Sequence, residues 1–84
     1  MHQRNEIRSL IRELLRRKGD EALFTDSESL IVSGRLESID GIEIVVFLES
    51  NFGIDFAKIG FDQTLIDSID CIAALTQKSS ELHQ

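Results

Sequence analysis

One serine stands where a helix is expected to begin, and it is the position with the clearest chemical potential in the chain. Ser38 follows an irregular segment and precedes a run of residues with helical periodicity. A hydroxyl at a helix start is exposed and lies at the positive end of the helix dipole, so an attached phosphodiester anion would suit it. An isolated serine at such a position more often only caps its helix, but the acid that would complete a capping box is replaced by Gly41.

The two histidines and the acidic residues of the chain form no catalytic or metal-binding pattern. His2 and His83 lie in the terminal segments, which are unsuited to holding a serine–histidine–aspartate geometry. Asp62, Asp67 and Asp70 lack the alternating ligands and the central glycine of a calcium loop, so we interpret them as caps and solvated surface. We therefore expect a protein that is not an enzyme and holds no metal.

Composition limits the class of protein. The chain has 84 residues, 42% of them hydrophobic, and a net charge of −6, which together indicate a single domain over residues 1–84 and disfavour a general nucleic-acid binder. The single cysteine, Cys71, cannot form an internal disulfide, and its acidic neighbours disfavour a thiolate, so we expect a partly buried small side chain. The longest apolar run, residues 44–48, is too short to cross a bilayer, and the first residues lack the apolar core of a signal peptide. We expect a cytoplasmic protein without a membrane span.

Residues 3–18 have the spacing of an amphipathic helix. The apolar face consists of Ile7, Leu10, Ile11, Leu14 and Leu15. Gly19 is expected to end this helix, and Glu13 and Arg17 are spaced to pair along it. Residues 1–18 contain six basic and two acidic side chains, whereas the rest of the chain contains three basic and thirteen acidic ones. We favour intramolecular attraction as the reason for this asymmetry over a basic docking site.

The segment between residues 19 and 37 is predicted to be an ordered loop. Glycine, aspartate, serine and threonine break the helical pattern there, but apolar residues recur. Residues 30–32 and Leu36 could hold the loop onto a helical core.

Residues 38–52 are rich in β-branched side chains, yet their periodicity indicates a helix. Ile39, Ile42, Val45, Val46 and Phe52 form one stripe, and Asp40, Glu43, Phe47 and Ser50 form a second. Gly53 is placed to end the helix in a left-handed conformation.

The last third of the chain contains a short turn and a final helix. Residues 57–59 are expected to form one irregular helical turn, and Thr64 with Asp67 resembles a capping box that begins a helix ending near Gln77. These elements predict an all-α fold, a small four-helix bundle with a long loop between the first and second helices and a short, irregular third helix. We expect it to be a monomer.

The order of these features resembles the acyl carrier protein family and its peptidyl and D-alanyl carrier relatives. In that family an aspartate–serine–leucine or aspartate–serine–isoleucine motif follows a loop, and Glu37-Ser38-Ile39 occupies its place, with glutamate instead of the usual aspartate. The acidic helix that follows, the Phe52-Gly53-Ile54 closure and the total length also match, so the resemblance spans nearly the whole chain.

The resemblance implies a function and a site. Ser38 would receive 4′-phosphopantetheine from coenzyme A through a phosphopantetheinyl transferase, and its thiol would carry an acyl or aminoacyl group as a thioester. Acyl-loading and acyl-transferring enzymes of a fatty-acid, lipid or secondary-metabolite pathway would be the partners. The residues implied in partner recognition are Glu37, Asp40, Glu43, Phe47 and Glu49. An acyl chain could be sheltered among the expected core residues Ile42, Val46, Phe52, Ile59 and Ile69.

Two alternatives remain open from the residues. The chain could be an unmodified helical interaction module that binds a partner through its acidic second helix, with Ser38 as a cap. Phe47 could be exposed for a partner pocket, or the helix could be rotated so that Phe47 is buried against the long loop.

Overall fold

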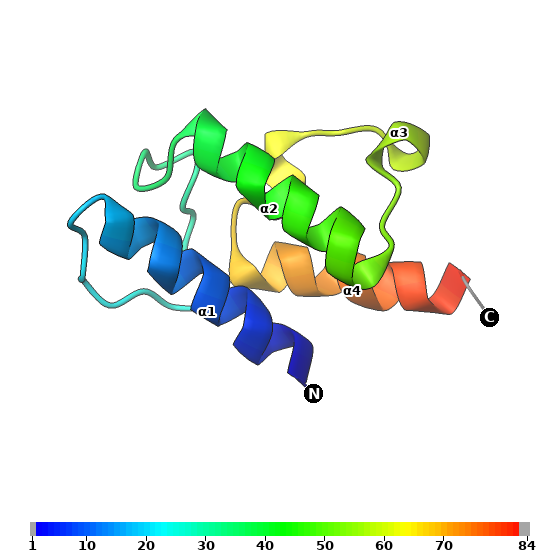
Figure 1. Ribbon diagram of the computed structural model, residues 1–84, viewed down its shortest axis with the longest axis horizontal. Helices are drawn as coiled ribbons and strands as arrows, with labels where there is room; N and C mark the ends of the chain where they lie inside the picture. Colours follow the sequence, from blue (N-terminus) through cyan, green and yellow to red (C-terminus); the bar gives the residue numbers. More distant parts are fainter. Residues whose placement is uncertain (1, 83–84) are drawn as a thin grey trace.

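The computed structural model describes residues 2–82, and it describes the side chains of residues 3–77. Its elements are α1 (His2–Arg17), α2 (Ser38–Phe52), α3 (Phe56–Ile59), the 3₁₀ helix η1 (Gln63–Ile66) and α4 (Ile69–Leu82). All regular structure in this part of the chain is helical (Figure 1). The predicted all-α fold, with a long loop before α2 and a short third helix, is confirmed.

Two glycines end the long helices where the sequence predicted. Gly19 has a φ of 80°, and its N–H donates to the carbonyl of Arg16 at 2.9 Å, which closes the last turn of α1. Gly53 has a φ of 67° and its N–H donates to the carbonyl of Leu48 at the end of α2. A side chain with a Cβ would be strained at either position.

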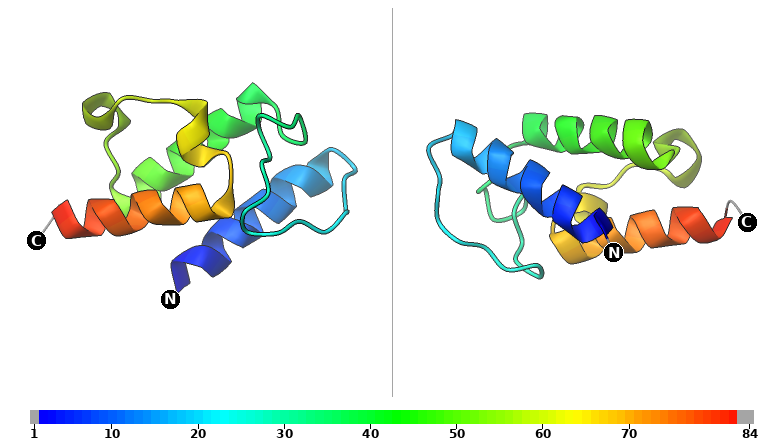
Figure 2. Two further views of the ribbon diagram at one scale, coloured as in Figure 1. Left: turned by 180° about the vertical axis from the view of Figure 1, so that it is seen from behind. Right: turned by 60° about the horizontal axis from the view of Figure 1, so that its bottom comes forward.

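The helices are arranged so that the end of α1 lies beside the start of α2. The two helices run in roughly opposite directions, and α4 packs against both (Figures 1 and 2). The 3₁₀ helix η1 lies between α2 and α4 and contacts each of them. The long loop, residues 18–37, therefore begins and ends at the same end of the molecule as Ser38.

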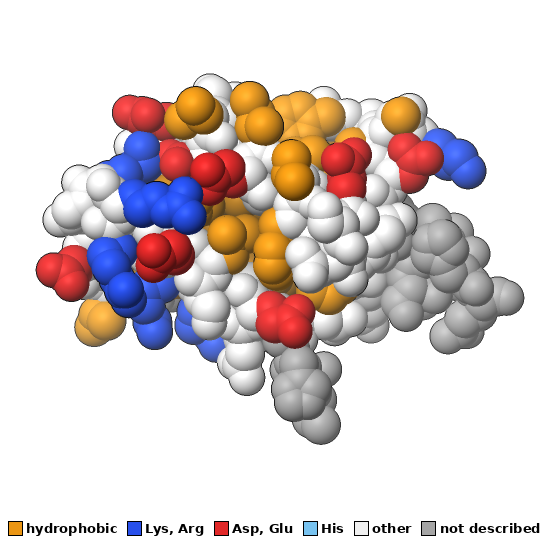
Figure 3. All heavy atoms as spheres, in the orientation of Figure 1, with side chains coloured by type: hydrophobic (Ala, Val, Ile, Leu, Met, Phe, Trp, Pro, Cys, Tyr) orange, Lys and Arg blue, Asp and Glu red, His pale blue; other side chains and the backbone are white. Residues whose placement is uncertain are grey.

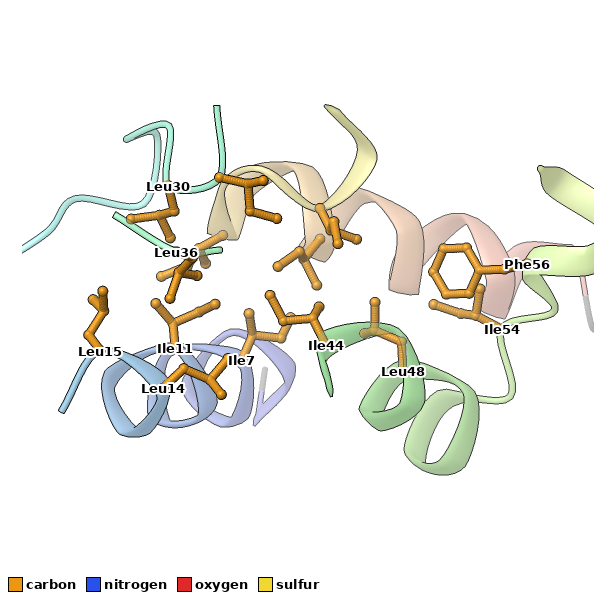
Figure 4. Close-up of a cluster of buried hydrophobic side chains, with 14 residues drawn as sticks. Ile7, Ile11, Leu14, Leu15, Leu30, Leu36, Ile44, Leu48, Ile54 and Phe56 are labelled. Atoms are coloured by element: carbon orange, nitrogen blue, oxygen red, sulfur yellow. The ribbon is translucent and has the colours of Figure 1, made fainter. Parts of the chain in front are cut away.

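A continuous apolar core joins all of these elements. Its fully buried side chains come from α1, the long loop, α2, η1 and α4 (Figure 4), namely Ile7, Ile11, Leu14, Leu15, Leu30, Leu36, Ile44, Leu48, Ile66, Ile69 and Ile72. The predicted face of α1 is thus confirmed, with Leu10 half-buried at its margin. Leu30, Ile31 and Leu36 hold the loop as expected, but Val32 is 68% exposed and takes no part.

The predicted orientation of α2 is wrong. The buried positions are Asp40, Gly41, Ile44 and Leu48, whereas Ile39, Ile42 and Val46 of the expected inner stripe point outward. Apolar residues occupy so many positions of this helix that periodicity alone does not select a face. Gly41 determines which face of α2 is buried. A Cβ at this position would lie 3.3 Å from Cδ1 of Ile66, so the absence of a side chain allows this face of α2 to pack closely on η1.

Two local predictions are also corrected. Thr64 and Asp67 do not begin α4, since Asp62 caps η1 through the Thr64 N–H, and the Oγ of Ser68 accepts from the Cys71 N–H at the start of α4. The pair expected between Glu13 and Arg17 is not formed. Glu13 instead lies 3.6 Å from Arg16.

Candidate functional site

Ser38 is the first residue of α2 and its side chain is exposed. The preceding residue, Glu37, has extended backbone angles and occupies the N-cap position. The Ser38 Oγ accepts one hydrogen bond, from Nε2 of Gln63 at 3.3 Å. The hydroxyl is therefore presented to solvent at the helix start and is not used to cap the helix.

Asp40 supplies the cap that the alternative interpretation assigned to Ser38. Its Oδ2 accepts from the Glu37 N–H at 2.8 Å. Asp40 is therefore the acid of a capping box that begins at Glu37, one residue before the box that would begin at Ser38 and that Gly41 interrupts. Lys18 Nζ lies 2.9 Å from the same oxygen and 3.2 Å from Oε2 of Glu37. Hydrogen bonds to Asp40 and then to Glu37 raise the pKa of Lys18. The end of α1 and the start of α2 are thereby tied together at Ser38.

The proposed recognition residues fall into different environments. Asp40 is only 8% exposed, so the expectation that its carboxylate lies on the exposed surface of α2 is wrong, because that carboxylate contacts the Glu37 N–H and Lys18. Glu43 is exposed but paired with Arg17, whose Nη1 lies 3.0 Å from its Oε2. Glu37 and Glu49 are exposed.

Phe47 lies between the two environments that the sequence allowed. It is half-buried, and its ring meets that of Phe52 edge to face with centroids 5.9 Å apart. The helix is rotated as the second alternative required, and Phe47 lines a shallow groove together with Leu10 of α1, to which no residue of the long loop contributes.

The expected acyl-chain residues do not form an interior lining. The expectation that they are core residues is wrong for Ile42, Val46 and Ile59, which are all exposed. Phe52 is half-buried and Ile69 is fully buried. The first two face outward because the rotation of α2 turns that stripe to the surface, and Ile59 ends the short helix α3 on the outside of the molecule.

The long loop that positions Ser38 is held by charge as well as by apolar contacts. Arg35 donates from Nη2 to Oδ1 of Asp20 at 3.1 Å and from Nη1 to Oε2 of Glu28 at 2.7 Å. Arg8 donates from Nη2 to both carboxylate oxygens of Asp26, at 2.8 and 2.9 Å. Arg8 thus takes part in the intramolecular attraction favoured above, and so does Arg4, whose Nη1 lies 2.7 Å from Oδ1 of Asp70.

Asp67 fastens the middle of the loop, so its interpretation as a cap or solvated surface residue is wrong. Its Oδ1 accepts from the N–H groups of Ile31 and Val32 at 2.7 and 2.8 Å. Burial would raise the pKa of Asp67, but the hydrogen bonds from the loop backbone outweigh it and hold the pKa below its usual value. No periodic pattern in the sequence predicts this contact, because the partners of Asp67 are backbone groups more than thirty residues away in sequence.

Among the side chains of residues 3–77, no cluster of three or more histidine, cysteine or acidic residues is arranged to hold a metal ion. No helix within residues 2–82 is both long enough and apolar enough to cross a membrane. Comparison with family models, curated proteins and solved structures finds no match to this chain.

Proposed function

We propose that the chain is a carrier protein of the acyl carrier type, which holds an acyl or aminoacyl group as a thioester on 4′-phosphopantetheine attached to Ser38. The observation that carries the proposal is the exposed Ser38 hydroxyl at the first position of α2, where Glu37 and Asp40 supply the cap and the hydroxyl makes no hydrogen bond to the helix backbone. A serine needed only to stabilise the helix would be expected to accept from the helix backbone, which Ser38 does not do.

The position of Ser38 suits a phosphodiester. The hydroxyl lies at the positive end of α2, and Lys18 at the same end offsets part of the negative charge of Glu37 and Asp40. When bound, the group supplies a thiol on a flexible arm that can form a thioester. The chain itself supplies the anchoring oxygen, a fixed helix start and a surface for the enzymes that load and unload the arm.

The ordered loop supports such a role physically. Arg35, Asp67 and the buried Leu36 fix the residues that lead into α2, so an arm on Ser38 would leave the molecule from a defined point. A carrier needs this definition because several enzymes must find the same thioester in turn.

The test is the intact mass of the protein after incubation with coenzyme A, magnesium and a broad-specificity phosphopantetheinyl transferase. We expect a gain of one phosphopantetheinyl group, with the hydroxyl proton replaced and the nucleotide part of coenzyme A released. Ser38→Ala should abolish the gain. Ser50→Ala, which changes another exposed serine of α2, should not.

A second candidate function is favoured by the exposed apolar side chains of α2, which also suit an unmodified interaction module. The mass measurement separates the two. Failure of several transferases to load the wild-type protein would overturn the carrier proposal and leave the interaction module.

A further inference from the structure

Among the side chains of residues 3–77, only that of Gln63 donates a hydrogen bond to the Ser38 hydroxyl. Its Nε2 lies 3.3 Å from the Ser38 Oγ, and both side chains are exposed. A hydrogen bond between two exposed neutral groups adds little to stability, because water satisfies both groups when the bond is broken. The fold therefore does not depend on this contact, which nevertheless places an amide directly at Ser38.

The packing of η1 against α2 brings Gln63 to this point. Ile66 is fully buried, and a Cβ on Gly41 would lie 3.3 Å from its Cδ1. Ser38 precedes Gly41 by three positions in α2, so these two residues lie on the same side of that helix. Gln63 precedes Ile66 by three positions in η1, where side chains at this spacing are eclipsed. The close contact between Gly41 and Ile66 thus places Gln63 beside Ser38, and the Asp62 cap holds the start of η1.

The charged side chains at the start of α2 leave no cation for a new anion on Ser38. Acidic and basic side chains lie together where the end of α1 meets the start of α2 (Figure 3). Glu37 and Asp40 share one cation, Lys18, so this group is net negative. The two acids are one and two positions from Ser38, so their side chains, and Lys18 with them, do not face the Ser38 side chain. A donor to a phosphodiester there must therefore come from another element.

We propose that Gln63 is a positioning residue whose amide donates to the phosphodiester of the arm on Ser38. The inference rests on the proposed function, because it applies only if Ser38 carries the arm. Loading replaces the hydroxyl proton with phosphorus, so the Ser38 Oγ can then accept a hydrogen bond but not donate one. The amide of Gln63 offers two N–H donors, enough for this oxygen and one anionic oxygen of the phosphate. Hydrogen bonds to an anion are stronger than those to a neutral hydroxyl, so the contact should tighten on loading.

The test is phosphorus NMR of the protein after loading by the transferase with coenzyme A. The reference is the loaded tryptic peptide 36–58, in which the same phosphodiester has no contact with Gln63. In loaded Gln63→Ala the phosphorus resonance and its transverse relaxation should shift from the wild-type values toward those of the peptide, because the phosphate moves more freely. Gln63→Glu keeps the shape but removes both donors and should shift them at least as far. Gln77→Glu makes the same change in α4, in a groove with Arg4 and Asp70, and should shift neither.

A second measurement needs only the wild-type protein in its loaded form. The side-chain amide resonances of Gln63 are assigned by their absence from the proton–nitrogen spectrum of unloaded Gln63→Ala. On loading of the wild-type protein they should shift, and their exchange with water should slow, because the amide gains an anionic acceptor. The side-chain amide of Asn51 donates to the Phe47 carbonyl in the same helix and provides the internal control, whose exchange should not change.

The outcomes separate the two proposals. No loading of the wild-type protein by any transferase overturns the proposed function, and the inference with it. Equal phosphorus signals in the loaded wild-type protein and loaded Gln63→Ala overturn the inference alone, and so does unchanged exchange of the Gln63 amide on loading. A shift in Gln77→Glu as large as that in Gln63→Glu also overturns it, since the effect would then be one of charge at any position. Urea unfolding of the unloaded proteins should give the same stability for Gln63→Ala as for the wild type, and a clear loss would instead assign Gln63 a structural role.

Discussion

The two connections that flank α2 are both irregular, but they are held in different ways. The first, residues 18–37, has no regular helix, yet Leu30, Ile31 and Leu36 in its second half are buried in the core. The second, residues 53–68, contains α3 and η1, yet residues 57–64 are all exposed, and its buried side chains lie toward its two ends. Regular structure is therefore a poor measure of order here. Buried anchors and charge contacts made within the connection are the better measure.

Both connections reach Ser38. The first reaches it through Lys18, which ties the start of the loop to Glu37 and Asp40. The second reaches it through Gln63, which makes one hydrogen bond of 3.3 Å to the Ser38 hydroxyl. The first connection thus fixes the helix start, and the second only touches it.

The largest effect is expected where the first connection enters the core. Leu36→Ala should lower the free energy of unfolding by about 2–5 kcal/mol, because it removes a fully buried side chain and leaves a cavity. Urea unfolding measures the loss. Val32→Ala, in the same loop but exposed, should change stability by no more than about 0.5 kcal/mol. Equal effects of the two substitutions would show that the loop is not anchored by burial.

Removing the carboxylate that fastens the loop should have the next largest effect. Asp67→Ala leaves the N–H groups of Ile31 and Val32 without their acceptor and should cost about 1–3 kcal/mol. Asp62→Ala, which removes a cap in the exposed part of the second connection, should cost less than about 1 kcal/mol. Urea unfolding of both variants measures the two losses of stability. A larger loss in Asp62→Ala than in Asp67→Ala would contradict the expected difference.

Acid should loosen the first connection. Hydrogen bonds from Arg35 lower the pKa values of Asp20 and Glu28, and a hydrogen bond from Arg8 lowers that of Asp26. Because the pKa values are depressed in the folded state, the stabilisation is complete above the unfolded-state values near about 4 and is lost as pH falls below them. Amide exchange of residues 20–28, followed from neutral pH to below about 4, should report this loss.

Arg35→Gln provides the control for the acid experiment. It removes the cation that holds Asp20 and Glu28, so the variant should be less stable near neutral pH and less sensitive to acid. An acid dependence unchanged from the wild-type protein would assign the effect to other carboxylates.

The sequence predicts the features of this fold that depend on local residue spacing, and it does not predict those that depend on contacts between distant segments. The face of α1, the stops at Gly19 and Gly53 and the buried Leu36 were predicted, because each depends on spacing or on a residue type with a local conformational preference. The orientation of α2 was not, because it depends on the close approach of Gly41 to Ile66, which no local pattern encodes.

The candidate site divides in the same way. The position of Ser38 at a helix start was predicted, but its neighbours Lys18 and Gln63 were not, since they come from elements distant in sequence. Asp40 was assigned to the surface for the same reason. Its partners, the Glu37 N–H and Lys18, become visible only when α1 and α2 are brought together.

The smallest effect is expected at the contact between the second connection and Ser38. Gln63→Ala removes a single exposed hydrogen bond and should change the free energy of unfolding by no more than about 0.5 kcal/mol. Asp40→Ala removes the cap and the partner of Lys18 and should cost about 1 kcal/mol or more. Amide exchange in the first turn of α2 should accelerate in Asp40→Ala and stay unchanged in Gln63→Ala, because only the first connection fixes that turn. Acceleration in Gln63→Ala would instead mean that both connections hold Ser38 in place.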